Sequence, residues 1–368
     1  MTFGVALIGG GIWAKEEHLP AVLASEHLEL KAIYSRSLKS AEDTAQASGK
    51  QVELYSEDSN QGYKDVLKRE DVDAVIIALP IASQASYIRA ALSAGKHVLS
   101  EKPVAENVAE AEALIKWYRE EIEHQKKATW SVAENFRYLD SFRQAREKVQ
   151  GLGKIIGFRV KVYGNIQQDG KFFSDTPSSS LCVYEKLTVI DLDTDWRKVP
   201  THQGGFLLDG GVHYTAGLRY LLGPDTFITR LSAFTTLLKE YLPPVDTVDA
   251  ILKTNTGVQG TFQVSNGTSL VGPEWTVGCE NGSVTVDFSK ITVRTLDDRE
   301  DVQDVQDERT GVPPEVRQWG QALAEGRVNP EQSPSQALGD LELLELMLRS
   351  GEGDGQPQNC RCQQPANI

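Results

Sequence analysis

The sequence is poor in cysteine and in positive charge. It has four cysteines in 368 residues, too few for a disulfide framework, and two of them, Cys360 and Cys362, lie in a polar C-terminal stretch without further metal ligands at zinc-like spacing. Basic residues number 38 against 52 acidic ones, which gives a formal net charge of −14. An acidic chain lacks the positive surface that binds nucleic acid or anionic membranes. We therefore expect no nucleic-acid partner, no membrane partner and no metal site.

Long apolar runs are also missing. No stretch reaches the roughly 18 uncharged apolar residues that a membrane span needs. Residues 1–4 lead directly into a strand-like segment without a basic region, so no secretory signal is expected. These absences predict a cytoplasmic protein in a reducing compartment.

The first third of the chain alternates strand and helix signals. At about 150 residues per domain, the length predicts two domains. Ala74–Leu79 is an almost continuous apolar run, as expected for a parallel strand buried on both faces. We predict an α/β domain over residues 1–128, a doubly wound Rossmann fold. Its strands are expected at 3–8, 28–34, 52–55, 74–79, 97–100 and 129–133.

After about residue 150 the strand–helix alternation gives way to successive strand-like runs separated by short turns, the pattern of β-hairpins. Turn signals occur at Asn266-Gly267 and Asn281-Gly282. One helix is expected at 207–222 and a closing helix at 335–349. We predict an α+β domain over 129–350 with a large, mainly antiparallel sheet, and a polar, flexible tail over 351–368. The acidic run 297–308 is interpreted as a solvated loop. Strands are expected at 155–163, 227–235, 248–254, 258–264, 275–278, 283–287 and 291–295.

The first chemical motif is a G-x-G-x-x-A run from Gly9 to Ala14, directly after the first strand. In dinucleotide-binding folds the first glycine permits a tight turn and the second lets the backbone approach a pyrophosphate, which the following helix amides hold. Ile12 and Trp13 supply two of those amides. A plain strand–helix turn can have the same glycines, but their place in the chain favours a dinucleotide.

The end of the second strand sets the choice of cofactor. NAD sites usually place an acidic residue there, whereas this chain has Ser35 and Arg36. A serine and an arginine suit the 2′-phosphate of NADP, and the alternative is a solvated loop arginine. We predict NADP(H).

The second motif is Glu101-Lys102-Pro103, at the end of the fifth strand. Pro103 biases Lys102 away from helical geometry, so the lysine should project where open α/β sheets have their ligand crevice. A lysine partly withdrawn from water can act as a general acid or base. Taken alone, however, this tripeptide is also ordinary surface sequence.

The third motif is the glycine-rich segment 204–213. In a helix, Asp209 and His213 are four residues apart and share one face. Gly210 and Gly211 would each cost that helix about 1 kcal/mol, a local conflict expected at functional sites. We infer that they let a flat ligand approach the backbone. The alternative is a structural Asp–His pair.

These three motifs, in this order, resemble the glucose–fructose oxidoreductase / inositol dehydrogenase / rhizopine-catabolism (Gfo/Idh/MocA) family over nearly the whole chain. Residues 132–138 and 196–213 look closest to a fungal-type, NADP-dependent branch. The resemblance implies that Lys102 is catalytic, often with a cis bond to proline, and that Asp209 and His213 are the paired residues of the glycine-rich helix. It also implies that Trp196 and Arg197 approach the nicotinamide.

The chain departs from the family pattern after the fourth strand. The family often has Thr-Pro-Asn followed by a histidine, whereas this chain runs from Leu79 and Pro80 to Gln84. We still count Leu79, Pro80, Glu101 and Lys102 among the cofactor-binding residues. His18, near the glycine run, is interpreted as a packing residue. An acidic loop at 191–202 resembles the start of a calcium loop but lacks its glycine and its final glutamate.

Together these observations predict an oxidoreductase that transfers a hydride between NADP(H) and a small hydroxyl or carbonyl compound held between the two domains. Lys102 is the main acid/base, His213 a second candidate, and Asp209 an orienting group. The alternative is a catalytically silent sensor of NADP or sugar on the same fold. An NAD-dependent polyol dehydrogenase is disfavoured by Arg36. An exposed face of the second sheet predicts a homo-oligomer.

Overall fold

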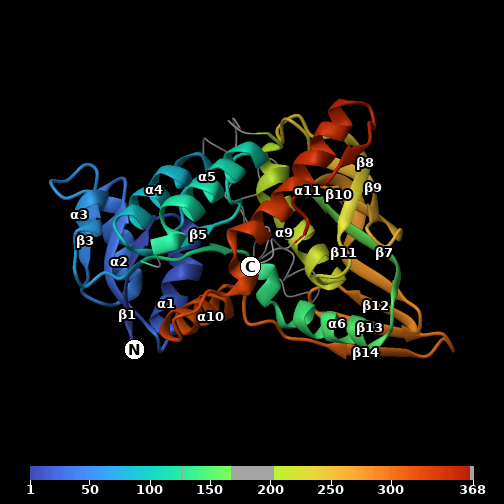
Figure 1. The fold of residues 1–368 in the computed structure, drawn as a ribbon, viewed down its shortest axis with the longest axis horizontal. Helices are drawn as coiled ribbons and strands as arrows, with labels where there is room; N and C mark the ends of the chain where they lie inside the picture. Colours follow the sequence, from blue (N-terminus) through green and yellow to red (C-terminus); the bar gives the residue numbers. More distant parts are fainter. Residues whose placement is uncertain (126, 167–202, 365–368) are drawn as a thin grey trace. The chain divides into compact units, whose positions relative to one another are not determined.

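The computed structural model describes residues 1–125, 127–166 and 203–364, and its chain divides into two compact units (Figure 1). The first unit comprises Met1–Asn135 and Gly311–Leu338, and the second comprises Phe136–Thr310 and Gly339–Ile368. The first unit therefore extends beyond residue 128 and includes a segment, 311–338, that the sequence placed in the second domain. No helix among the described residues has the length and apolar character to cross a membrane.

The first unit is built on a six-stranded, wholly parallel sheet in the order β3-β2-β1-β4-β5-β6. This confirms the predicted doubly wound fold. The strand order reverses between β1 and β4, and the carboxyl ends of strands at such a point form the usual ligand crevice of open α/β sheets. The strands are β1 (Phe3–Ile8), β2 (Leu28–Ser35), β3 (Glu53–Ser56), β4 (Ala74–Ile77), β5 (His97–Glu101) and β6 (Trp130–Ala133).

Helices connect these strands. A π-helix, η1 (Ala14–His18), runs directly into α1 (Leu19–Ala24). The others are α2 (Leu38–Ser48), α3 (Tyr63–Leu67), α4 (Ile81–Ser93) and α5 (Val108–Glu121), with a short 3₁₀ turn, η2 (Glu123–Gln125). Each parallel strand thus has its carboxyl end followed by a helical connection, which places the loops after β1, β2, β4 and β5 at one edge of the sheet.

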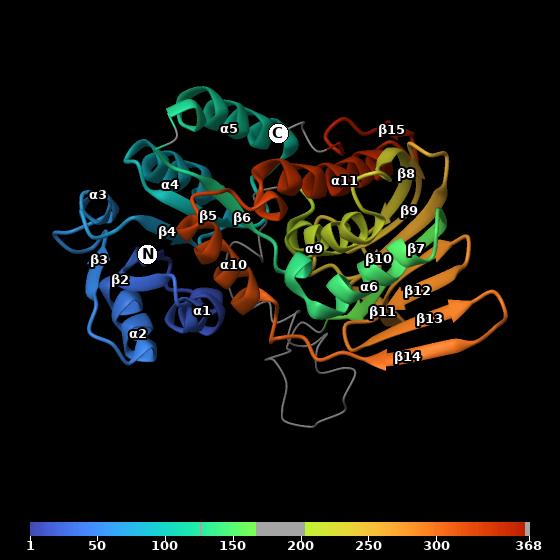
Figure 2. The same ribbon diagram turned by 60° about the horizontal axis from the view of Figure 1, so that its bottom comes forward.

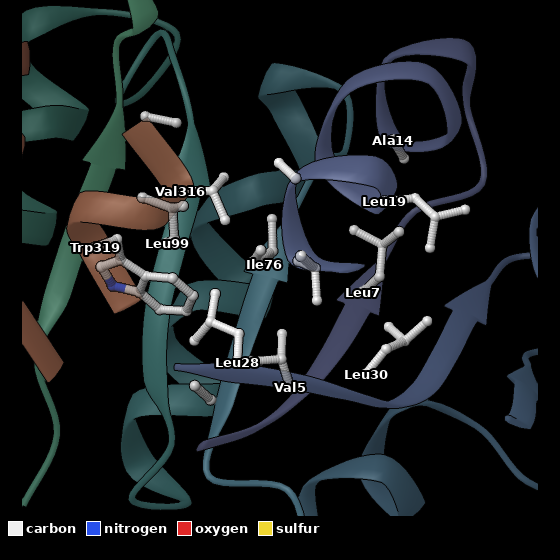
Figure 3. Close-up of a cluster of buried hydrophobic side chains, with 14 of the residues drawn as sticks. Val5, Leu7, Ala14, Leu19, Leu28, Leu30, Ile76, Leu99, Val316 and Trp319 are labelled. Carbon is white, nitrogen blue, oxygen red and sulfur yellow. The ribbon is translucent and has the colours of Figure 1, made fainter. Parts of the chain in front are cut away.

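The core of this unit includes a helix from far along the chain. Figure 3 shows Val316 and Trp319 of α10 (Val312–Ala324) beside Val5 of β1 and Leu99 of β5, all fully buried or nearly so. Burial of each large apolar side chain contributes about 1.5–3 kcal/mol. This packing is why residues 311–338 belong to the first unit.

The second unit is built on a nine-stranded sheet in the order β14-β13-β12-β11-β7-β10-β9-β8-β15. β7 and β10 are parallel and the other neighbours are antiparallel, which confirms the predicted, mainly antiparallel sheet. The strands are β7 (Ile155–Asn165), β8 (Ile228–Thr236), β9 (Thr247–Thr254), β10 (Gln259–Ser265), β11 (Gly267–Cys279), β12 (Gly282–Val286), β13 (Lys290–Thr295), β14 (Glu300–Asp304) and β15 (Gln358–Asn359).

Helices of the second unit lie against one face of this sheet (Figure 2). They are α6 (Asp140–Gly151) and α9 (Gly205–Leu222), with α11 (Pro334–Glu352) packed on α9. Two short 3₁₀ turns complete the described elements: η3 (Asn135–Tyr138), where the chain passes from the first unit to the second, and η4 (Pro330–Gln332) of the first unit. On the opposite face, alternate side chains of the central strands are exposed or half-buried.

Three expectations for this unit are wrong. Asn266-Gly267 does not close a hairpin, because β10 and β11 lie on opposite sides of β7. The acidic run 297–308 contains β14, which pairs with β13 through its backbone. The segment expected to be a flexible tail is ordered through residue 364: β15 pairs with β8, and the Glu342 carboxylate accepts the backbone N–H groups of Arg361 and Cys362.

Candidate cofactor and catalytic site

The glycines after β1 have different roles. Gly9 has φ +132°, and a Cβ there would lie 2.2 Å from the carbonyl oxygen of Ala78. A Cβ on Gly10 would lie 2.3 Å from the Ser40 hydroxyl. A Cβ on Gly11 would meet none of the described atoms within 4 Å. Gly9 and Gly10 are therefore required by packing, whereas Gly11 faces open space, as an approaching dinucleotide requires.

The helix after these glycines begins at Gly11. Its first backbone bond joins the N–H of Lys15 to the carbonyl of Gly11 at 3.1 Å, so the amides of Ile12 and Trp13 take no part in the helical ladder. Ile12 is 44% exposed. The indole Nε1 of Trp13 donates to Glu101 Oε1 at 2.8 Å, so Trp13 can offer a ligand its backbone while its side chain binds Glu101.

Ser35 and Arg36 stand at the carboxyl end of β2. Ser35 is buried, whereas Arg36 is exposed and forms no hydrogen bond or ion pair with the described residues. Ser37 caps α2 by accepting the N–H of Ser40, and the Ser40 hydroxyl donates to the carbonyl of Gly10 at 3.1 Å. The Arg36 guanidinium is thus available to a phosphate, on a loop tied to the glycine turn.

An acidic residue nearby was missed in the sequence. Asp58, two residues after β3, accepts the N–H of Leu38, the first residue of α2, at 2.8 Å. In the sequence, the only sign of this residue is the acidic pair Glu57-Asp58 directly after β3. The pairing of β3 with β2 brings this pair next to the loop that contains Arg36, and that pairing could not be seen in the sequence.

Lys102 directly follows β5, and its bond to Pro103 is cis, as the family resemblance implies. The lysine is half-buried. The preceding Glu101 is 9% exposed, and its Oε1 accepts both Trp13 Nε1 and, at 2.6 Å, His18 Nε2. His18 is therefore more than the packing residue that the sequence indicated.

Leu79 and Pro80 form the half-buried connection from β4 to α4. Gln84, one turn into α4, is 1% exposed, and neither atom of its amide has a hydrogen-bond partner among the described residues.

Asp209 and His213 lie on α9 of the second unit, both buried. The His213 ring stacks on Phe136, with centroids 4.8 Å apart and the planes inclined by 12°. The inference that the helix glycines let a flat ligand approach stays a prediction for Gly210, where a Cβ would meet no described atom nearer than the Tyr214 hydroxyl at 3.9 Å. It is wrong for Gly211, whose Cβ would lie 2.8 Å from Leu344 of α11.

Trp196 and Arg197, predicted at the nicotinamide end, lie outside the described residues, as does the acidic loop 191–202.

A doubly wound parallel sheet with a glycine turn at its switch point is the arrangement of a dinucleotide-binding domain. The family profile described as "Oxidoreductase family, NAD-binding Rossmann fold" matches residues 3–125, and that of the "GFO/IDH/MocA C-terminal domain" matches residues 142–285. The chain belongs to the Gfo/Idh/MocA oxidoreductase family.

Individual relatives agree with this assignment. The chain is 36% identical over 365 residues to the dehydrogenase FPY6 of Fusarium mangiferae, covering 96% of this chain and 97% of the relative. Among solved structures, an oxidoreductase from Thermotoga maritima matches with a TM-score of 0.81 and 28% identity over 98% of both chains. A mutant of a 3-ketoreductase from Actinomadura kijaniata, in complex with TDP-benzene and NADP, shares the fold, with a TM-score of 0.72 and 22% identity over 95% and 98% of the chains.

Proposed function

We propose that this protein is an NADP(H)-dependent oxidoreductase of a fungal-type branch, acting on a small hydroxyl or carbonyl compound such as a sugar, polyol or diol. The observation that carries the proposal is the position of Lys102. It leaves β5 at the same sheet edge as the open turn at Gly11, so the unit that would bind the dinucleotide also presents an acid/base. The dehydrogenase of Fusarium and the NADP-bound 3-ketoreductase support this reaction class.

The residues divide the chemistry between them. The nicotinamide, when bound, supplies or accepts the hydride. Lys102 Nζ donates a proton to the substrate oxygen during reduction and removes it during oxidation, a role that contributes about 10²–10⁴-fold to rate. His213 is the second candidate for this proton transfer, with Asp209 as its orienting partner. Arg36 and Ser35 bind the 2′-phosphate, and the amides after Gly11 bind the pyrophosphate.

Replacement of the lysine tests the assignment. We expect Lys102→Ala to lower kcat at least about 100-fold with little change in the dissociation constant of NADPH, because the lysine acts on the substrate oxygen. NADPH oxidation would be followed with a panel of sugars, diones, imines and aldehydes, and NADPH binding by fluorescence titration.

Lys96→Ala is the matched control. Lys96 lies just before β5, at its other end, and donates to the carbonyls of Arg69 and Val72, so its loss should affect stability and leave turnover unchanged. Unchanged turnover in Lys102→Ala would refute the catalytic role. A wild-type protein that binds NADPH but oxidises it with no member of the panel would favour the sensor.

A further inference from the structure

Two side chains of the helix after the glycine turn converge on one buried carboxylate. Glu101, the last residue of β5, is 9% exposed, and its Oε1 accepts Trp13 Nε1 at 2.8 Å and His18 Nε2 at 2.6 Å. A buried carboxylate is costly unless hydrogen bonds replace its water. Bonds from N–H donors to a carboxylate are also among the stronger ones in proteins. These two bonds therefore fix the residue immediately before Lys102.

The π-helix makes this convergence possible. In an α-helix each residue turns by about 100°, so side chains five residues apart, such as those of Trp13 and His18, would point about 140° away from each other. Residues Ala14–His18 form a π-helix, in which the N–H of Leu19 donates to the carbonyl of Ala14, five residues back. This i→i+5 geometry brings residues five apart onto nearly the same side, and such turns are frequent at functional sites.

The surroundings of His18 define its chemical state. Its side chain is fully buried, and Nδ1 has no hydrogen-bond partner among the described residues. A buried N–H without an acceptor is rarer in proteins than an acceptor without a donor. The hydrogen bond to the Glu101 carboxylate therefore needs a proton on Nε2, which makes His18 a donor to Glu101.

We propose that His18, together with Trp13, is a positioning residue for Lys102 that acts through Glu101. This inference rests on the proposed catalytic role of Lys102. Trp13 and His18, whose side chains bind Glu101, belong to the helix that begins at Gly11. One helix therefore positions both the backbone amides that would bind the pyrophosphate and the residue before Lys102. A displacement of about 1 Å at a reacting group can cost about 100-fold in rate.

Two replacements of His18 separate positioning from packing. His18→Leu removes the donor to Glu101, and we expect kcat to fall by about tenfold or more while the dissociation constant of NADPH stays within about threefold. His18→Gln keeps an N–H that reaches Glu101 and should recover most of the rate. If His18→Leu fails to fold, Trp13→Phe removes the other donor and should lower kcat in the same direction.

His97→Leu is the matched control. His97 opens β5 at the end opposite Lys102, and its Nδ1 lies 2.9 Å from the Thr129 hydroxyl. Its loss should lower the melting temperature and leave kcat unchanged.

A second readout needs neither substrate nor cofactor. Acetic anhydride labels amines at a rate that depends on their surroundings, and mass spectrometry of the Lys102 peptide gives that rate in the apo protein. We expect His18→Leu to change the labelling rate of Lys102 at least about threefold, and His18→Gln and His97→Leu to leave it unchanged.

The inference would be overturned if His18→Leu kept both the wild-type kcat and the wild-type labelling rate of Lys102. It would also be overturned if His18→Leu and His18→Gln lowered kcat equally. Failure of the wild type to oxidise NADPH would refute the proposed function instead, and the labelling rates would still decide whether His18 positions Lys102.

Discussion

At the scale of single residues, the ends of β2 and β3 bring opposite charges to one edge of the sheet. Ser35 and Ser56 are partners in register, so the loops that follow them leave the sheet side by side. Arg36 in the first loop is exposed, and Asp58 in the second accepts the N–H of Leu38 at the start of α2. A helix N-terminus attracts anions, so Asp58 occupies a position that suits a phosphate oxygen. Arg36 would attract a 2′-phosphate and Asp58 would repel it.

Two substitutions should therefore shift the cofactor preference in opposite directions. We expect Arg36→Ala to weaken NADPH binding about tenfold or more, because it removes a charge-assisted contact to the 2′-phosphate. Asp58→Asn should tighten NADPH binding about three- to tenfold, since it removes a like charge and keeps an oxygen for Leu38. Fluorescence titration with NADPH measures both.

NADH, which lacks the 2′-phosphate, is the control ligand for each variant, and its dissociation constant should change less than about twofold. If NADH binds the wild type more tightly than NADPH does, the predicted cofactor preference is wrong.

At the scale of elements, the glycines of α9 differ in their surroundings. Gly211 meets Leu344 of α11, and Gly217 meets Phe142 of α6, each closely enough that a Cβ would clash. Gly210 has no such neighbour among the described residues. The helix therefore keeps two of its glycines for close packing, although glycine is unfavourable inside a helix.

This difference predicts opposite effects of the same substitution. Gly211→Ala should destabilise the protein by about 1–3 kcal/mol, because the Leu344 side chain must move in a packed core. Gly210→Ala is the matched control one residue away, and it should stabilise the helix by up to about 1 kcal/mol. Thermal unfolding followed by circular dichroism compares them. A lower melting temperature for Gly210→Ala than for Gly211→Ala would contradict this account of α9.

Helices and strands that have a recognisable pattern of apolar residues in their own segment could be predicted from the sequence. β1 and β4 are short apolar runs buried on both faces, and α9 was found despite its glycines. α10 was missed although its buried residues Val316, Trp319 and Leu323 recur at helical spacing. Only its packing on β1 and α1, about 300 residues earlier, leaves no local pattern. β14 was missed because it is an acidic edge strand, which lacks the apolar alternation that indicates a strand.

The same limit applies to the site. Gly11, Arg36 and Lys102 stand in motifs with a chemical rationale, so they could be selected from the sequence. His18 could not, because its contact with Glu101 depends on a π-helical turn that no residue pattern predicts.

At the scale of the whole molecule, the chain has a net charge of −14, and on the outward face of the second sheet, opposite its helices, one carboxylate is paired with two cations. Lys161 Nζ lies 2.7 Å from Glu274 Oε2, and Arg159 binds the other oxygen of the same carboxylate. Burial alone would raise the pKa of Glu274, but the hydrogen bonds from Lys161, Arg159 and Thr276 outweigh it and lower that pKa to about 2. This face therefore contains a carboxylate that stays ionised in mild acid.

The lowered pKa predicts a pH-dependent contribution to stability. The pKa of a free glutamate is about 4.3. The ionised Glu274 therefore stabilises the fold fully above about pH 5. This contribution is lost as the pH falls toward 2, the pKa of Glu274 in the folded protein. We expect Glu274→Gln to cost about 1 kcal/mol at pH 7 and progressively less between pH 5 and 3. Urea unfolding at several pH values measures the difference, and a cost that grows as the pH falls would contradict the assigned direction.

The same face is where we expect copies of the protein to associate. Two acidic copies repel each other, so a stable contact needs a surface with neutralised charges and apolar side chains. The outward face offers both: the Glu274 ion pairs, and Phe234 of β8 and Ile251 of β9, exposed by 61% and 60%. We predict a homo-oligomer in size-exclusion chromatography with light scattering, and a smaller mass for Ile251→Lys. Leu296→Lys, in the turn after β13, is the control and should keep the wild-type mass. A monomeric wild type, or an unchanged mass for Ile251→Lys, would exclude this face as the interface.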